Sequence, residues 1–93
     1  MAQSTIVRIR NDVRSLNYVV SHHAVEELDD DNLTILDLEN ILLTSEIVEH
    51  KRDRKTHEPK FVVRGATVGG LQAEAVVKFG RLGNLFVVTV YLV

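Results

Sequence analysis

The chain has 93 residues, of which 45% are hydrophobic and 26% charged, with a net charge of −2 and no cysteine. These values are typical of one globular domain, and they exclude a disordered chain, a disulfide-stabilised fold and a zinc site built on thiolates. No stretch approaches the roughly 18 apolar residues of a membrane helix, and the N-terminal segment is charged where a signal peptide is apolar. We therefore expect a cytoplasmic protein without a membrane partner.

The first half of the chain is predicted to be helical, because its apolar residues recur at every third or fourth position. The predicted helices cover residues 5–16, about 22–30 and about 34–43. Ser21 is a suitable N-cap for the second helix, and Thr34 with Asp37 forms a capping-box pattern at the start of the third. Between the first two helices, residues 18–20 are expected to form only a short extended connector.

The second half of the chain changes to period-two alternation, which predicts strands. The predicted strands cover residues 46–52, 60–64, 71–79 and 85–93. Short turn segments separate them, so we expect an antiparallel meander. The predicted fold is therefore α+β, with two to three N-terminal helices packed on one face of a four-stranded antiparallel sheet.

Alternation also predicts which side chains share the sheet face that the helices leave open. In the last strand, Phe86, Val88, Val90 and Leu92 form the row expected under the helices. The polar side chains expected on the other face are Lys60, Arg64, Glu74, Lys78, Thr89 and Tyr91. Their cations and hydroxyls suit the binding of a phosphate group, with Lys60, Lys78 and Thr89 as substrate-binding residues. The alternative is an ordinary solvated sheet face.

Two adjacent histidines open the second predicted helix. His23 lies away from the apolar arc formed by Ala24, Val25 and Leu28, so we expect it to face solvent, where an imidazole can act as a general base. Adjacent helical residues diverge by about 100°, which does not suit metal ligation. We therefore predict neither a metal site nor a cofactor. An ordinary surface histidine is the alternative reading.

Charge is distributed unevenly along the chain. Residues 26–49 contain nine acidic residues and no Lys or Arg, whereas residues 51–64 contain six basic residues against Asp53 and Glu58. The net charge excludes a uniformly basic nucleic-acid binder, but the basic segment could meet phosphate or an acidic partner. The acidic segment could instead seat a basic protein partner or the basic segment of a second copy, giving a homodimer.

Four stretches in a fixed order, over about residues 6–92, resemble a bacterial family known only as a domain of unknown function, DUF4258. The stretches are VVSHHA, LTILDLENILLTSEIVEH, KFVVRG and VVTVY. That family is similar to the RelE- and BrnT-type toxins of toxin–antitoxin systems. The resemblance implies a RelE/barnase-like fold, metal-independent cleavage of RNA and a cognate antitoxin as protein partner.

The resemblance also implies roles for particular residues. His23 would act as the base or acid, Arg64 (with Lys60) as the phosphate clamp, and Tyr91 as a proton donor or base-stacking group. Where the family usually carries arginines after the His-Ala pair, this chain has Glu27 and Asp31. Because these carboxylates reverse the local charge, an alternative is a non-catalytic protein-binding module or a dimeric interaction protein on the same fold. A third possibility is that the apolar last strand lies at an exposed sheet edge and pairs with another chain.

Overall fold

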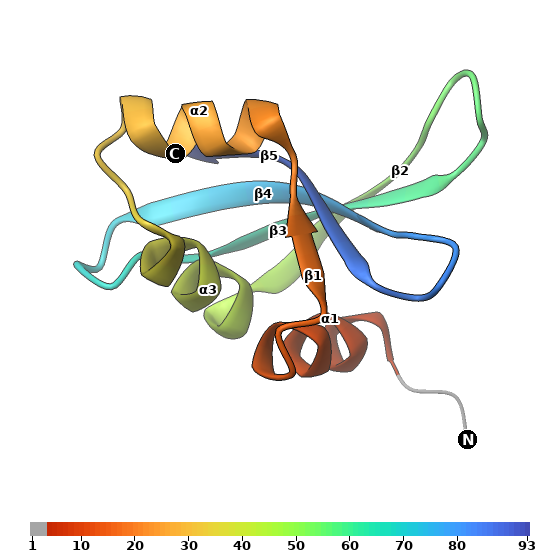
Figure 1. Ribbon diagram of the computed structural model, residues 1–93, viewed down its shortest axis with the longest axis horizontal. Helices are drawn as coiled ribbons and strands as arrows, with labels where there is room; N and C mark the ends of the chain where they lie inside the picture. The colour runs from red at the N-terminus through yellow and green to blue at the C-terminus, as the bar shows by residue number, and fades with distance from the viewer. Residues whose placement is uncertain (1–3) are drawn as a thin grey trace.

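The computed structural model describes residues 4–93, which form three helices and one five-stranded sheet (Figure 1). The elements in chain order are α1 (Thr5–Arg14), β1 (Tyr18–Val20), α2 (His22–Asp30), α3 (Ile35–Thr44), β2 (Glu46–Arg52), β3 (Pro59–Ala66), β4 (Gln72–Phe79) and β5 (Leu85–Leu92). The predicted α+β class is confirmed, and each predicted helix and strand is present with small shifts at its ends. No helix within residues 4–93 is long and apolar enough to cross a membrane.

The predicted helix caps are formed by the residues that the sequence indicated. The Ser21 hydroxyl accepts a hydrogen bond from the Ala24 N–H at 3.0 Å. Thr34 and Asp37 form a reciprocal capping box at the start of α3. The first helix ends at Arg14 and not at Leu16, because Leu16 has a φ of 58°, in the left-handed region where a right-handed helix cannot continue.

The sheet has the strand order β1-β5-β4-β3-β2. Strands β2 to β5 form the predicted antiparallel meander, but a purely antiparallel four-stranded sheet was the wrong prediction. Residues 18–20 form a fifth strand that runs parallel to β5, with Tyr18 opposite Leu85 and Val20 opposite Val87. Three strand-forming residues thereby pair with a segment more than 60 positions later in the chain, and local periodicity does not report such a partner.

The position of β5 also overturns the prediction of an exposed last strand. This strand lies between β1 and β4, so its first half is paired on both sides. Beyond Val87 the partner strand β1 has ended, and α2 lies along that part of β5 (Figure 1). The outer edge of the C-terminal strand is therefore covered by β1 and α2 of its own chain.

A β-bulge in β5 changes which side chains face the core. Val77 of β4 pairs with Val87, but the next pair along the ladder is Val76 with Thr89, so Val88 is the extra residue. Before the bulge, Leu85 and Val87 are fully buried. The prediction that Phe86 and Val88 lie under the helices was therefore wrong. After the bulge the predicted faces hold, with Val90 buried and Thr89 and Tyr91 on the opposite face.

Helices α1 and α3 cover one face of the sheet, and the core lies between these layers (Figure 1). The fully buried side chains include Ile9 of α1, Leu38 and Ile41 of α3, and Val63 and Val77 of the sheet. The opposite sheet face is called the open face below. Helix α2 rises at one side of this face, and the β2–β3 hairpin extends away from the body at the other (Figure 1).

Candidate functional site

Three predicted open-face residues form one row across three neighbouring strands. Arg64 of β3 is directly opposite Glu74 of β4, and Glu74 is directly opposite Tyr91 of β5. Arg64 donates two hydrogen bonds to Glu74 Oε2, from Nε at 2.9 Å and from Nη2 at 2.6 Å. The Tyr91 hydroxyl donates to the other oxygen, Oε1, at 2.8 Å. Glu74 is therefore the centre of this row, and it is 9% exposed.

The bonds within this row fix its protonation at neutral pH. The hydrogen bond from Tyr91, followed by the one from Arg64, lowers the pKa of Glu74. The same bond to Glu74, together with burial, raises the pKa of Tyr91. The carboxylate is therefore charged and the phenol keeps its proton.

A second cluster connects α2 to β5. His23 Nε2 lies 3.4 Å from Glu27 Oε1, one helical turn along α2, and the His23 side chain is 69% exposed. The same Glu27 oxygen accepts hydrogen bonds from the Thr89 hydroxyl and, at 3.0 Å, from the backbone N–H of Val90. His23 thus faces solvent, as predicted, beside a carboxylate that β5 holds in place.

The early end of β1 explains this arrangement. Because β1 stops at Val20, the outer edge of β5 beyond Val87 has no strand partner. Polar side chains of the α2 segment satisfy that edge: Ser21 Oγ donates to the Val88 carbonyl at 2.7 Å, and Glu27 accepts from the Val90 N–H. Ser21 at the start of α2 and Glu27 within it therefore attach this helix to the sheet.

The two clusters are neighbours on the open face. Thr89 and Tyr91 are two positions apart on the same strand, so they point to the same side at a spacing of about 7 Å. The structure therefore brings His23, Thr89, Tyr91 and Arg64 into one continuous polar strip.

The two predicted lysines also lie on the open face, nearer the β2–β3 hairpin. Lys60 Nζ is 3.0 Å from Asp53 Oδ2, and Lys78 Nζ is 3.1 Å from Glu58 Oε2. Hydrogen bonds from the Thr56 N–H and from Lys60 hold the pKa of Asp53 well below its ordinary value, so that carboxylate stays charged. Each predicted cation is thus already paired with a carboxylate, and a bound phosphate would have to compete for it.

Glu27 and Glu74 are the residues whose roles the sequence did not reveal. Glu74 was placed on the correct face without a function, although its place between Arg64 and Tyr91 in adjacent strands is a signal of cross-strand pairing. Glu27 was read as a change of charge beside His23, and its contacts with β5 were not predicted. No local pattern indicates that β1 ends early and that the Val90 N–H therefore needs an acceptor.

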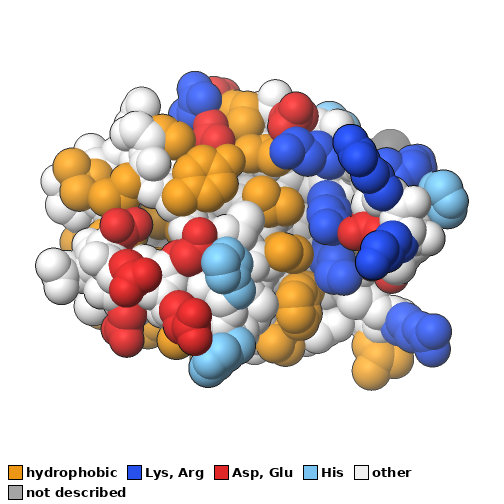
Figure 2. Space-filling model, turned by 90° about the horizontal axis from the view of Figure 1, so that it is seen from above, with side chains coloured by type: hydrophobic (Ala, Val, Ile, Leu, Met, Phe, Trp, Pro, Cys, Tyr) orange, Lys and Arg blue, Asp and Glu red, His pale blue; other side chains and the backbone are white. Residues whose placement is uncertain are grey.

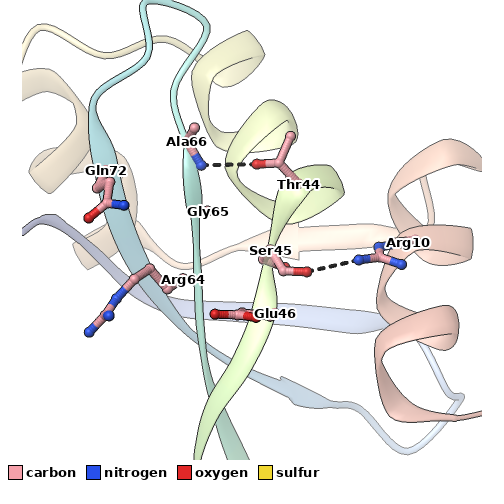
Figure 3. A pocket seen from close by; sticks show the side chains of 8 residues that line it. All are labelled: Arg10, Thr44, Ser45, Glu46, Arg64, Gly65, Ala66 and Gln72. Carbon is pink, nitrogen blue, oxygen red and sulfur yellow. Dashed lines mark hydrogen bonds between the residues drawn. The ribbon is translucent and has the colours of Figure 1, made fainter.

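Arg64 also lines a hollow of about 380 Å³ where α3 leads into β2 (Figure 3). The lining residues are Arg10, Thr44, Ser45, Glu46, Arg64, Gly65, Ala66 and Gln72. Arg10 reaches in from α1 and donates to the Ser45 carbonyl at 2.9 Å, while Arg64 and Gln72 lie on the other side (Figure 3). Glu46 is directly opposite Arg64 in the β2–β3 ladder, and the Arg64 guanidinium bonds to Glu74 of β4.

Within residues 4–93, no group of three His, Cys, Asp or Glu side chains is placed to share a metal ion. Neither a curated protein nor a solved structure gives a significant match to this chain. One family does match, over residues 20–92, a span that contains α2, α3 and the whole β2–β5 meander. The chain therefore belongs to the family described as Domain of unknown function (DUF4258).

Proposed function

We propose that this protein binds and cleaves RNA at the open face, as a metal-independent ribonuclease of the toxin–antitoxin type. The observation that carries the proposal is the joining of two clusters, His23–Glu27–Thr89 and Tyr91–Glu74–Arg64, through neighbouring positions of β5. A base, a cation and a proton donor can together catalyse phosphodiester cleavage through a ribose 2′-hydroxyl, and the protonated phenol would be the donor. The proposal includes a RelE/barnase-like fold, a cytoplasmic location and an antitoxin protein as partner.

In the proposed reaction, His23 takes the proton of the 2′-hydroxyl, whose oxygen then attacks the adjacent phosphorus. The exposed imidazole is accessible to RNA, and Glu27 orients it from one helical turn away. Arg64, whose side chain is 47% exposed, stabilises the charge that develops on the phosphate oxygens. The leaving 5′-oxygen takes a proton from Tyr91. Before the reaction the phenol is protonated, because its hydrogen bond to Glu74 raises its pKa.

Substrate binding on this face requires an exchange of partners. Arg64, Lys60 and Lys78 each bond to a carboxylate in the structure. A phosphate group would take over part of these bonds, and the displaced carboxylates would repel it. We therefore propose a slow enzyme that prefers low salt, at which the residual attraction of the cations is least screened.

The test is cleavage of a single-stranded RNA in the presence of EDTA. The wild-type protein should cut it, and His23→Ala should reduce the rate at least about a hundredfold, because general-base catalysis contributes on this scale. His22→Ala is the matched control: the neighbouring side chain is 91% exposed and contacts only Glu26 among the ion pairs of the described chain, so the rate should stay unchanged.

A second substrate tests the attacking group. RNA with a single 2′-deoxy nucleotide at the cut position should resist cleavage there, because the nucleophile is missing. Cleavage that survives either His23→Ala or the 2′-deoxy substitution would exclude the mechanism.

A second candidate is a non-catalytic binding module for a basic protein partner. It is supported by the carboxylates that neutralise Arg64, Lys60 and Lys78, and by the acidic residues Glu27 and Asp31 at α2. This candidate predicts that the purified wild-type protein, assayed as above, neither cuts nor retains RNA.

A further inference from the structure

Two patches of opposite charge lie at opposite sides of the open face. The acidic patch consists of exposed side chains at α2 and its C-cap: Glu26, Asp29, Asp30 and Asp31. The basic patch consists of exposed side chains of the β2–β3 hairpin: Lys51, Arg52, Arg54 and Lys55. Seen from above, acidic side chains and two histidines gather at one side, Lys and Arg gather at the other, and hydrophobic side chains lie between them (Figure 2).

Most charges of these patches have no ion-pair partner among residues 4–93; one exception is Lys51, whose Nζ lies 3.5 Å from Glu49 Oε2. Among the ion pairs formed by residues 4–93, none includes Asp29, Asp30 or Asp31, and none includes Arg54 or Lys55. Glu26 contacts only the imidazole of His22, at 3.0 Å. Like charges held close together repel one another, so each patch is stabilised by a surface of the opposite sign.

The arrangement makes the open face complementary to itself. A two-fold axis that lies in the plane of this face, and runs between the patches, turns a second copy so that its acidic patch meets the basic patch of the first. The same rotation places the first copy's acidic patch on the second copy's basic patch and brings the hydrophobic strips together. This holds whatever the separation of the patches, because a two-fold interface is reciprocal.

We infer that the occupant of the open face, in the absence of RNA, is a second copy of this chain in a two-fold dimer held by reciprocal contacts between the acidic and basic patches. Exposed apolar surface on the face, including Tyr91 at 36%, is covered by the same contact. The inference does not rest on the ribonuclease proposal. If both hold, dimer formation covers His23 and Tyr91, so RNA and the second copy exclude one another.

The first test is the molar mass in solution, measured by light scattering after gel filtration over a series of protein concentrations. At low salt the wild-type protein should reach twice the 10.5 kDa of the chain. At about 1 M salt, where the Debye length falls to about 3 Å, it should be monomeric. A monomer at every salt and protein concentration would overturn the inference, and so would a series of species larger than a dimer, because a head-to-tail contact does not close.

The second test neutralises one patch at a time. Variant one carries Glu26→Lys and Asp30→Lys, two exposed residues one helical turn apart, and variant two carries Arg54→Glu and Lys55→Glu in the hairpin turn. In each variant the two introduced charges cancel the two that remain in that patch, so its net charge is zero and the self-association should weaken by about tenfold or more. An equimolar mixture should regain part of the association, because the intact basic patch of variant one again meets the intact acidic patch of variant two.

Restoration in the mixture separates patch pairing from damage to the fold. A matched control, Arg14→Glu with Arg81→Glu, changes the net charge as much as variant two does, but at exposed residues outside both patches. It should dimerise like the wild-type protein. A mixture that stays monomeric, or a control that dissociates as variant two does, would show that the patches do not form the interface. Neither result depends on whether the protein cuts RNA.

Discussion

At the residue scale, two glutamates organise the open face by gathering donors from different elements. Glu74 accepts bonds from β3 and β5, and Glu27 accepts bonds from two consecutive residues of β5 while lying beside His23. A carboxylate has two oxygens with several lone pairs, so one side chain can satisfy donors that a neutral side chain would leave unpaired. In this protein the acidic residues of the site are therefore structural as well as electrostatic.

We predict that Glu27→Ala destabilises the protein by about 1–3 kcal/mol, because the Val90 N–H and the Thr89 hydroxyl would lose their acceptor in a partly buried place. Urea denaturation measures the change. Glu26→Ala is the matched control: that side chain is 62% exposed, and its loss should change the free energy of unfolding by less than about 0.5 kcal/mol. Equal losses in the two variants would mean that Glu27 does not attach α2 to β5.

Much of the candidate site could be placed from the sequence, because strand alternation and helical angles are local rules. They put Arg64, Tyr91 and Thr89 on one face and turned His23 toward solvent, which the structure confirms. These local rules could not predict which of those side chains bond to one another. Glu74 receives Arg64 and Tyr91 from two separate strands, and that coincidence depends on the register of the sheet.

At the element scale, the sequence predicted helices and hairpin strands well and the edges of the sheet poorly. Caps such as Ser21 and the Thr34–Asp37 box depend on residues three positions apart, so they are visible in sequence. The parallel pairing of residues 18–20 depends on β5, far along the chain. The bulge at Val88 is equally hidden, since alternation looks the same with or without one extra residue in the ladder.

The contact between α3 and β3 depends on a residue without a side chain. A Cβ at Gly65 would clash with the backbone carbonyl of Ile41, so the glycine lets the helix approach the strand. We predict that Gly65→Ala costs about 1–3 kcal/mol, because the helix must move away from the sheet. The midpoint of thermal or urea unfolding measures the loss.

Gly69→Ala is the control for this substitution, because no heavy atom lies within 4 Å of a Cβ at that turn position. It should leave stability unchanged or slightly raised, since alanine restricts the unfolded chain more than glycine does. If both substitutions were equally harmless, the close approach at Gly65 would not contribute to stability.

At the scale of the whole molecule, ionised carboxylates accept hydrogen bonds in several parts of the fold, so the free energy of unfolding should depend on pH in the acid range. The pKa values of Asp37, Asp53 and Glu74 are lowered in the folded state by hydrogen bonds that favour the charged form. Their stabilisation is complete above the ordinary pKa of the unfolded chain, 4.5 for Glu74, and is lost as pH falls through the lower folded value.

We therefore predict that the free energy of unfolding is nearly constant from neutral pH to about pH 5 and then falls with further acidification. Glu74→Gln should lower stability at neutral pH and make the acid-induced fall shallower, because one titrating group is removed. Asp30→Asn, at an exposed carboxyl that forms no ion pair within residues 4–93, should leave the slope unchanged. Identical slopes in all three proteins would show that Glu74 is not linked to folding.

The bulge at Val88 makes the spacing of β5 as important as its chemistry. Leu85 and Val87 face the core before the bulge, and Thr89 and Tyr91 face outward after it, although all four occupy odd positions of the same strand. Removing Val88 would restore simple alternation along β5. Either Leu85 and Val87 would then leave the core, or Thr89 and Tyr91 would turn inward. A substitution in β5 changes the contacts of one side chain, whereas deleting one residue would make it impossible to keep both the core packing and the open-face residues in place.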